Sequence, residues 1–481
     1  MIKRICEKYK KIPIQVRASI WFLTCSFFQK AISVISTPIF TRLLSNDEYG
    51  KFSVYTSWQS IIGIFVTLNL FCGVYTSGLV KFKENRAEFI SAMEGLTTVL
   101  SVVGFVIYLM FSAFFNKLFL LTTFQMCAMI IQLWTSAIFS FWAAEQRVEY
   151  AYRGLIRVTV ITSILKPLIG VILVITCKDK VTARIVGLAL VEVVCFSWMF
   201  IKQIRRCKNL FSSFFWKYAI KFNVPLIPHY LAQNILSSSD RIMISRMVDD
   251  KSAGIYSLAY SISLIMNLFN TALTQTLSPW VYEKIKNREE KDIEKTVSIA
   301  IILIAAVNII LIIFAPEIVK MFAPVSYYDA VWVIPPITMS VYFTFLYDIF
   351  SYYEFYFEKT KFIAIATMMA SVLNMLLNFI CIKVWGYRAA GYTTLICYVL
   401  YSVGHYFVMC NVANENLNGN RIINAKKLLM ISLSFMIVGF VFCALYNYTA
   451  LRYMLAIVIL MLVFLYHKKI VSLVIKNMVA L

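Results

Sequence analysis

The sequence lacks the short motifs by which many enzymes bind nucleotides or metals. Gly50-Lys51 resembles part of a phosphate-binding loop, but the upstream glycine and the following Ser or Thr are missing, and no strand leads into a glycine-rich turn. The 11 cysteines form no C-x2-C pair, and there are only 3 histidines. We therefore expect no cofactor and no metal site, and we expect most cysteines to act as small buried hydrophobic residues.

Charge is also scarce, at 15% of the 481 residues, whereas 60% are hydrophobic. Apolar runs of about 20 residues recur from end to end and leave no room for a sizeable soluble domain, so an all-α polytopic membrane protein is predicted. The first apolar run contains Lys30 and is not followed by a small-residue cleavage site, so it is predicted to be a spanning helix rather than a removed signal peptide. We expect about 14 spanning helices, at 17–40, 51–75, 89–111, 117–141, 154–176, 183–203, 217–245, 254–280, 296–315, 330–353, 361–382, 388–410, 427–446 and 450–466.

The basic residues are distributed unevenly between the predicted loops. With both termini in the cytoplasm, about 30 of the 46 Lys and Arg residues fall in or beside cytoplasmic segments, as the positive-inside rule requires. The net charge of +22 then reflects a solvated face against anionic lipid, and no nucleic-acid partner is expected.

A sequence pattern near the N-terminus recurs 204 residues later. The pattern Q-x3-S-x8-R-x7-G-x-[FY]-S runs from Gln29 to Ser53 and again from Gln233 to Ser257. Six predicted helices separate the copies, so the first and seventh helices cross in the same direction, which indicates a parallel repeat of two six-helix bundles. We expect an N-terminal lobe at 1–210, a C-terminal lobe at 211–411 and two additional C-terminal helices within 412–481.

Short acidic segments precede the second helix of each copy, at 45–48 and 249–252. Acidic external loops can be catalytic in lipid–sugar transferases. Here they recur symmetrically before a helix start, and Ser45-x-x-Glu48 has the spacing of a capping box. Both segments are therefore predicted to be helix caps.

Basic residues inside the predicted spans are the first candidates for a binding site. They are Lys30, Lys166 and Arg241. A buried cation costs about 2.5–3.5 kcal/mol even on the mildest insertion scale, so it must be paired or hydrated. One interpretation is a cavity that attracts an anionic substrate, in which Lys30 and Arg241 face each other across the lobe interface.

The alternative is that these bases are paired with the buried acids Glu192, Asp240 and Asp348. Those acids are also candidates for carrying H⁺ or binding Na⁺, although a counter-ion role is more common. Asp240 and Arg241 are adjacent in sequence and point about 100° apart on a helix, so they need not pair with each other.

The predicted helix at 217–245 has a polar side formed by His229, Gln233, Ser237 and Asp240, three or four residues apart. Such a side cannot face lipid, so it either lines a water-filled cavity or joins helices. Because the helix at 17–40 has a similar polar side, we favour the cavity and add Gln233 and His229 to the candidate substrate-binding residues.

Three segments resemble a known family. Thr37–Tyr55 (TPIFTRLLSNDEYGKFSVY) resembles the opening of bacterial Wzx-type polysaccharide flippases of the multidrug/oligosaccharidyl-lipid/polysaccharide exporter superfamily. Ser238–Tyr260 resembles the start of that family's second half, and Ala315–Pro336 resembles its connection between helices 9 and 10. The two extra C-terminal helices are similar to those of the lipid II flippase branch.

The resemblance implies a non-enzymatic transporter in the bacterial cytoplasmic membrane. Its substrate would be an undecaprenyl-diphosphate-linked oligosaccharide, such as an O-antigen or capsule repeat unit, moved by alternating access through a cationic central cavity. Membrane lipids, H⁺ or Na⁺, and the polysaccharide polymerase or chain-length machinery are the implied partners.

Two other functions remain open. A cation-coupled multidrug exporter of the same superfamily should have an acidic cavity. The residues expected to be buried are instead four bases, Lys30, Lys166, Lys221 and Arg241, against three acids. An O-antigen polymerase or lipid–sugar glycosyltransferase needs large external loops. No loop here exceeds about 16 residues, and that class offers no reason for the repeat.

Overall fold

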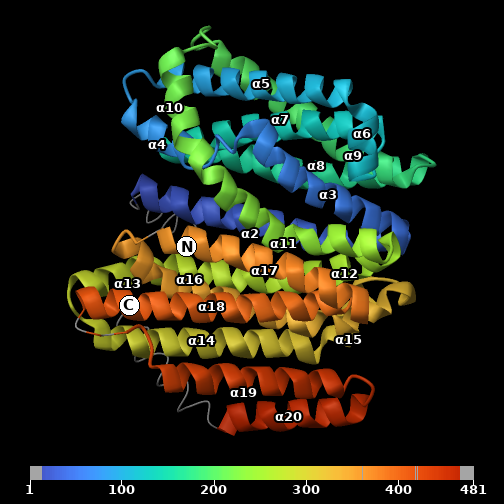
Figure 1. Cartoon of the computed structure of the whole chain (residues 1–481), viewed down its shortest axis with the longest axis vertical. Coiled ribbons are helices and arrows are strands. Elements are labelled where there is room, and N and C mark those ends of the chain that lie inside the picture. The colour runs from blue at the N-terminus through green and yellow to red at the C-terminus, as the bar shows by residue number, and fades with distance from the viewer. Residues whose placement is uncertain (1–12, 360, 418, 420, 466–481) are drawn as a thin grey trace, which may run out of the picture. The chain divides into compact units, whose positions relative to one another are not determined.

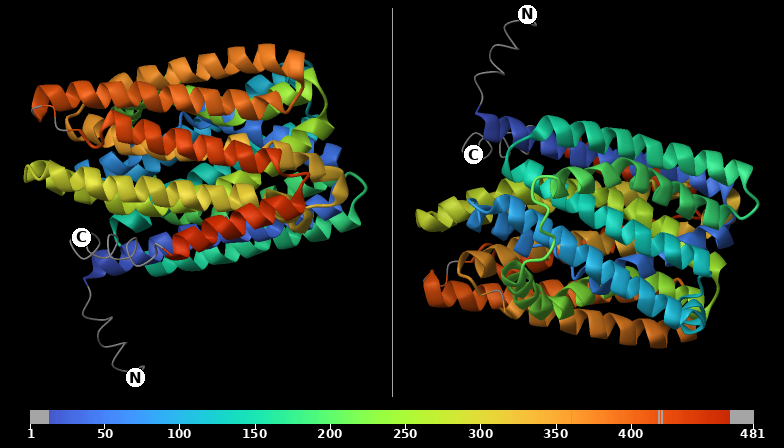
Figure 2. Two further views of the ribbon diagram at one scale, coloured as in Figure 1. Left: turned by 90° about the horizontal axis from the view of Figure 1, so that it is seen from below. Right: turned by 90° about the horizontal axis from the view of Figure 1, so that it is seen from above.

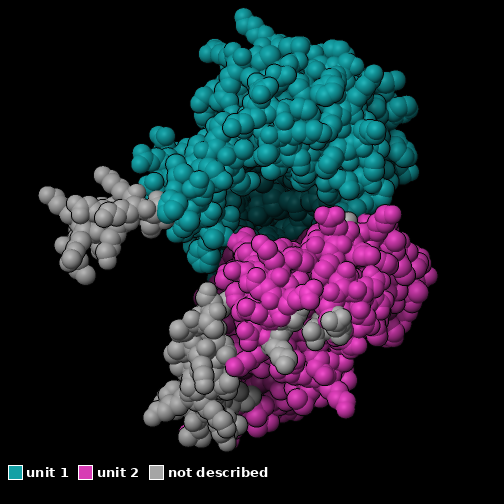
Figure 3. All heavy atoms as spheres, turned by 90° about the vertical axis from the view of Figure 1, so that its left-hand side faces the viewer, with its two compact units in different colours: residues 1–238 teal, residues 239–481 magenta. Residues whose placement is uncertain are grey.

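The computed structural model describes residues 13–359, 361–417, 419 and 421–465. Within these residues all regular structure is helical (Figures 1 and 2). The chain divides into two compact units, Met1–Ser238 and Ser239–Leu481, which Figure 3 distinguishes by colour. The all-α prediction is confirmed, whereas the predicted lobe boundaries at 210 and 411 remain predictions.

Unit 1 is a bundle in which α8 packs against α2 and α9, and α7 packs against α3, α5 and α9. Its elements are α2 (Ile14–Leu43), α3 (Asn46–Thr67), α4 (Val74–Lys81), α5 (Arg86–Met110), α6 (Ser112–Phe119), α7 (Thr123–Val148), α8 (Tyr152–Thr176), α9 (Lys180–Ile204), α10 (Ser213–Asn223), the 3-10 turn η1 (Val224–Leu226) and the first half of α11 (Ile227–Met247).

Unit 2 is built around α16, which packs against α12, α13, α14 and α18. After the second half of α11 come α12 (Asp250–Ser263), η2 (Leu264–Met266), α13 (Asn267–Lys286), α14 (Glu290–Ile313), α15 (Ala315–Phe322), η3 (Val325–Trp332), α16 (Ile334–Tyr356), α17 (Lys361–Trp385), α18 (Ala389–Asn416), α19 (Ala425–Ala444) and α20 (Thr449–Leu465). Figure 1 shows α19 and α20 at the edge of this unit, beside α14.

The helices explain why the chain enters a membrane. Among the described residues, 10 helices are long and apolar enough to span a bilayer, or 11 if η3 and α16, bent by 49°, form one span. Their outer faces carry large apolar side chains such as Val194, which is 69% exposed, as expected for contact with lipid. The chain is therefore a multi-pass membrane protein, and the predicted total of 14 spans is consistent with this count.

Several predicted helices are interrupted, among them that at 254–280, which η2 divides. The predicted helix at 51–75 ends at Thr67, because Leu68 and Asn69 both adopt the left-handed conformation, each with φ 48°. The predicted helix at 217–245 is divided by η1, where Pro225 lies in the first turn and has no backbone N–H to continue the α-helical ladder.

The predicted repeat has a clear structural counterpart at its turns. α2 ends at Leu43 and α11 at Met247, and the helices that follow start at Asn46 and Asp250, so both pairs of bounds differ by 204 positions. Both following helices begin with the predicted cap. Ser45 and Glu48 form a complete capping box, and the Asp249 carboxylate accepts the backbone N–H of Ser252 at 2.6 Å. The cap interpretation is therefore confirmed.

Candidate functional site

A polar cavity of about 290 Å³ lies inside unit 1, between α2, α3, α8 and α9. Its polar lining comes from Gln29, Ser33, Ser36, Thr162, Ser163, Lys166 and Arg184. Gln29 and Ser33 belong to the repeated pattern, and they lie four residues apart on one side of α2. The cavity lining holds two cations, several hydroxyl groups and no carboxylate.

Lys166 is not an isolated charge. Its Nζ lies 2.7 Å from Oε1 of Glu192 on α9, and the two side chains are 31% and 9% exposed. The other oxygen of Glu192 accepts hydrogen bonds from Ser136 at 3.0 Å and from Thr135 at 3.3 Å, both on α7. The structure thus brings two predicted site residues, Lys166 and Glu192, together as an ion pair. This agrees with the interpretation in which the basic residues of the spans are paired with buried acids.

Arg184 is a second cation of this cavity that the sequence gave no reason to select. Its guanidinium lies 3.6 Å from the ring centroid of Phe52 and 4.0 Å from that of Phe40. Stacking between aromatic rings holds the guanidinium plane in place and leaves its edge for hydrogen bonds. Arg184 lies near the start of α9, where a basic residue resembles any helix-end charge, so sequence spacing could not distinguish it.

Asp240 lies at the centre of a buried hydrogen-bond network in unit 2. Its Oδ2 accepts from Tyr256 on α12 at 2.5 Å and from Thr394 on α18 at 2.9 Å, and its Oδ1 accepts from Asn378 on α17 at 2.5 Å. Asn378 also donates to Asn374 at 3.1 Å. These five side chains are at most 1% exposed, and one carboxylate therefore ties together four helices.

The other predicted substrate-binding residues lie outside this network and do not line the unit 1 cavity. Arg241 is half-buried in unit 2, with its guanidinium 4.1 Å from the ring centroid of Tyr260. In unit 1, Lys30 and Gln233 are exposed on α2 and α11, and His229 is half-buried. The roles of these four residues remain predictions.

Asp348 is half-buried and lines a different cavity of about 480 Å³ in unit 2, together with Gln275, Tyr282 and Tyr352. Buried acids are more numerous than the three expected from the sequence. Glu94 and Glu145 are 1% exposed, and Glu354 is fully buried against His405, with 2.5 Å between Oε1 and Nδ1. For Glu94, Glu354 and His405 the only sequence signal was a single Glu or His beside an apolar run, whereas Glu145 stands directly before Gln146 and Arg147.

Asp240→Ala is expected to destabilise unit 2 strongly. The substitution leaves Asn378, Tyr256 and Thr394 without their acceptor in a fully buried site, and each unsatisfied group costs about 1–3 kcal/mol. Asp240→Asn retains one acceptor oxygen and should lose much less. Thermal unfolding of the purified protein, followed by intrinsic fluorescence, measures the difference.

Ser239→Ala provides the matched control. The Ser239 hydroxyl is buried beside Asp240 in the sequence, and its hydrogen bond to Asn374 is long, at 3.5 Å. We expect its midpoint to stay close to that of the wild type. Equal midpoints for Asp240→Ala and Ser239→Ala would show that the network contributes little to stability.

The fold matches solved transporters over most of the chain. An inward-facing multidrug resistance MATE family transporter of the MOP superfamily aligns with a TM-score of 0.62 and 13% identity, over 80% of this chain and 95% of that one. An outward-facing transporter of the same description gives 0.55 at 14% identity, over 83% and 96%. A MOP superfamily transporter from Pyrococcus furiosus, whose structure is described as having a binding pocket of reverse polarity, gives 0.55 at 14% identity, over 83% and 95%. The chain has the same fold as these solved transporters.

Sequence comparison places the chain more narrowly. The polysaccharide biosynthesis protein family matches residues 16–284, and the MatE family matches residues 225–380. The chain belongs to the polysaccharide biosynthesis protein family.

Two curated proteins from Haemophilus influenzae match shorter parts of this chain. "Lsg locus putative protein 1" is 23% identical over 41% of this chain, and an "Uncharacterized membrane protein" is 25% identical over 34%. The alignments span 51% and 40% of those relatives' own lengths.

Proposed function

We propose that this protein is a flippase that carries an undecaprenyl-diphosphate-linked oligosaccharide, an O-antigen or capsule repeat unit, across the bacterial cytoplasmic membrane. The observation that carries the proposal is the lining of the unit 1 cavity, in which Arg184 and Lys166 are joined by hydroxyl and amide groups without a carboxylate. A diphosphate loses its hydration on leaving water, and arginine and lysine replace that solvation through charge-assisted hydrogen bonds. The hydroxyl and amide groups of the lining can form hydrogen bonds with the hydroxyl groups of the sugars.

The ion pair between Lys166 and Glu192 allows Lys166 to exchange one anionic partner, Glu192, for an anionic substrate. Glu192 is held by Ser136 and Thr135 as well as by Lys166, so it keeps hydrogen-bond donors when Lys166 turns toward an anionic substrate. Lys166 is the more exposed partner and has a flexible stem, so it is the group that moves. The substrate then competes with Glu192 for Lys166. When the salt bridge forms again in the next conformation of the transport cycle, it favours release of the substrate.

Proton or Na⁺ coupling is assigned in this proposal to the buried acids Asp240, Glu192 and Asp348. Asp240 supports this role because its surroundings are hydroxyl and amide groups from three other helices, and such groups can shift when the carboxylate changes its charge or its bound ion. Lys30, Arg241, Gln233 and His229 are proposed to contact the substrate. Both termini are proposed to be cytoplasmic, with the polysaccharide polymerase and chain-length machinery as partners.

Reconstituted liposomes test the proposal against the multidrug alternative. We expect the protein to move an undecaprenyl-diphosphate-linked oligosaccharide between leaflets, measured by the accessibility of its sugar to an external lectin. Under the same gradient it should not export a cationic dye. Liposomes that contain the Arg184→Ala variant serve as the matched control.

Dye export without movement of the lipid-linked sugar would favour the multidrug exporter. Extension of the sugar chain, without movement between leaflets, would favour a polymerase or transferase. Either result would contradict the flippase proposal.

A further inference from the structure

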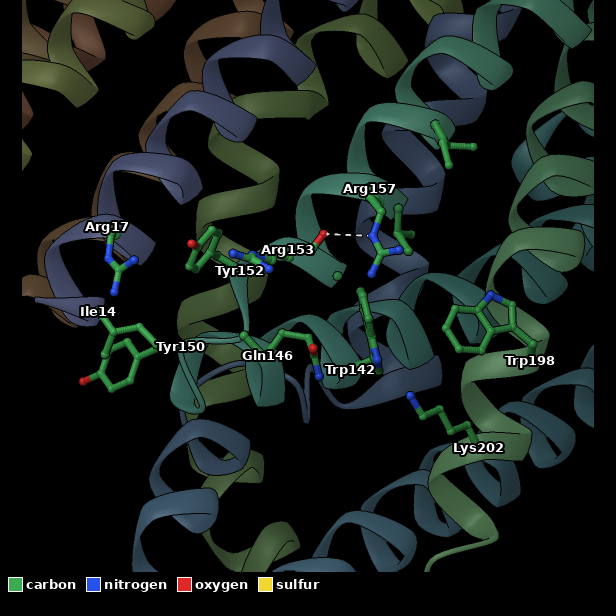
Figure 4. Close-up of a pocket in the computed structure, with 14 residues that line it drawn as sticks. Ile14, Arg17, Trp142, Gln146, Tyr150, Tyr152, Arg153, Arg157, Trp198 and Lys202 are labelled. Atoms are coloured by element: carbon green, nitrogen blue, oxygen red, sulfur yellow. Dashed lines mark hydrogen bonds between the residues drawn. The ribbon is translucent and has the colours of Figure 1, made fainter. Parts of the chain in front are cut away.

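We propose that a second, larger pocket of unit 1 binds the phosphate of an anionic lipid headgroup. This pocket, of about 840 Å³, lies where α2 and α8 begin and α7 and α9 end, and it shares no lining residue with the cavity described above. Figure 4 shows Arg17, Trp142, Gln146, Arg153, Arg157 and Lys202 around one opening. The inference does not depend on the transport proposal.

The lining of the pocket is rich in basic side chains. Four of its lining residues are Arg or Lys, contributed by α2, α8 and α9, and none is Asp or Glu. Arg157 is held over the start of α8 by a hydrogen bond of 3.4 Å from its Nε to the backbone carbonyl of Arg153, which leaves its terminal nitrogens as further donors. Like charges gathered at one site repel one another, and a bound anion relieves that repulsion.

The start of α8 adds backbone donors to the same pocket. This helix of 25 residues begins at Tyr152 after Ala151, and no side chain caps it. Its first N–H groups and the positive end of its dipole therefore favour an anion.

Trp142 forms part of the wall of this pocket. It is only 3% exposed, it lines the pocket, and its indole N–H has no hydrogen-bond acceptor within the described residues. Trp198 packs edge-on against Trp142, with 6.2 Å between centroids, and is 43% exposed.

A lipid rather than a soluble anion is the occupant that fits the location. The positive-inside rule assigns this end of unit 1 to the cytoplasmic surface, where the leaflet carries anionic headgroups. Exposed apolar side chains continue from the pocket along α2 and α8, with Ile14 46% and Ile161 51% exposed, and they provide a path for an acyl or isoprenoid chain. Tryptophan is also enriched at headgroup depth.

The test measures lipid binding to the purified full-length protein. Native mass spectrometry is run with phosphatidylglycerol, undecaprenyl diphosphate, neutral phosphatidylcholine and inorganic phosphate as separate probes. We expect the wild type to bind both anionic lipids more tightly than phosphatidylcholine. The Arg153→Gln/Arg157→Gln double variant should bind anionic lipid about tenfold more weakly.

The Lys83→Gln/Lys208→Gln double variant removes the same charge from exposed positions outside the pocket and should bind lipid as the wild type does. Far-ultraviolet circular dichroism confirms that each variant is folded. A loss confined to undecaprenyl diphosphate would support the site and identify the lipid carrier as its ligand. Loss of phosphatidylglycerol as well would support a site for anionic lipids in general.

Two results would overturn the inference. One is equal binding of anionic lipids by the wild type and the Arg153/Arg157 variant, and the other is binding of inorganic phosphate as tight as that of either lipid. Both are measured without a transport assay, so failure here leaves the flippase proposal standing, and failed transport leaves this inference standing.

Discussion

Lys30→Ala and Arg241→Ala are each expected to abolish surface polysaccharide while the protein still inserts into the membrane. Lys30 is exposed and forms no ion pair within the described residues, so its removal should cost little stability. Arg241→Ala loses a cation–π contact with Tyr260, which costs about 0.5–2 kcal/mol. A diphosphate that loses one of its charge-assisted contacts should lose most of its binding. Surface polysaccharide at native expression, with immunoblotting of membranes, measures both effects.

Charge-retaining variants separate substrate binding from structure. Lys30→Arg should keep part of the activity, whereas Arg241→Lys keeps the charge but loses the planar fork of donors and should fall further. Lys178→Ala, at an exposed position outside the predicted spans, is the matched control and should export normally. Normal export by both alanine variants would reject a cationic contribution from these two residues.

Removing both Lys166 and Glu192, which form the salt bridge in unit 1, is expected to recover the stability that Lys166→Met alone loses, but not transport. Lys166→Met alone leaves the Glu192 carboxylate buried without its cation, a change that typically costs about 3–5 kcal/mol when the acid stays ionised. The Lys166→Met/Glu192→Gln double variant removes both charges, and Ser136 and Thr135 can still bond to the amide, so its unfolding temperature should approach that of the wild type.

The double variant then isolates the proposed role of Lys166 toward substrate. If that lysine leaves Glu192 to contact a diphosphate, lipid-linked sugar transport in liposomes should remain at least about tenfold below wild type, despite normal folding. The single variant Glu192→Gln keeps Lys166 and should transport, with weaker dependence on an ion gradient. Full transport by the double variant would assign the pair a purely structural role.

The fold was largely predictable because it depends on long, strongly patterned features. Apolar runs identified the spanning helices, and the 204-residue repeat located two equivalent turns whose caps the structure confirms. The interruptions at Leu68 and at η1 were missed, because a left-handed residue or a 3-10 turn changes hydropathy very little.

The candidate site was less predictable, because partners come from helices far apart in the sequence. Glu192 was one of three acids considered for Lys166, but only tertiary packing brings them within 2.7 Å. Asn374 and Asn378, four residues apart in an apolar run, were a usable signal for a polar contact and were overlooked. Asp240, which accepts from Asn378, lies 138 positions earlier, so spacing alone could not connect them.

The turns after α2 and α11 are equivalent, so positions 204 residues apart can be compared between the polar interiors of the two halves. At the 204-residue offset, Ser36 and Phe52 of the first half correspond to Asp240 and Tyr256 of the second. The first pair lines a cavity, whereas the second pair is joined by a hydrogen bond of 2.5 Å in a closed network. An ancestral gene duplication would have supplied two identical interiors. Their divergence, into a cavity wall at these positions of the first half and a closed network at the equivalent positions of the second, then allowed selection to specialise each one without disturbing the other.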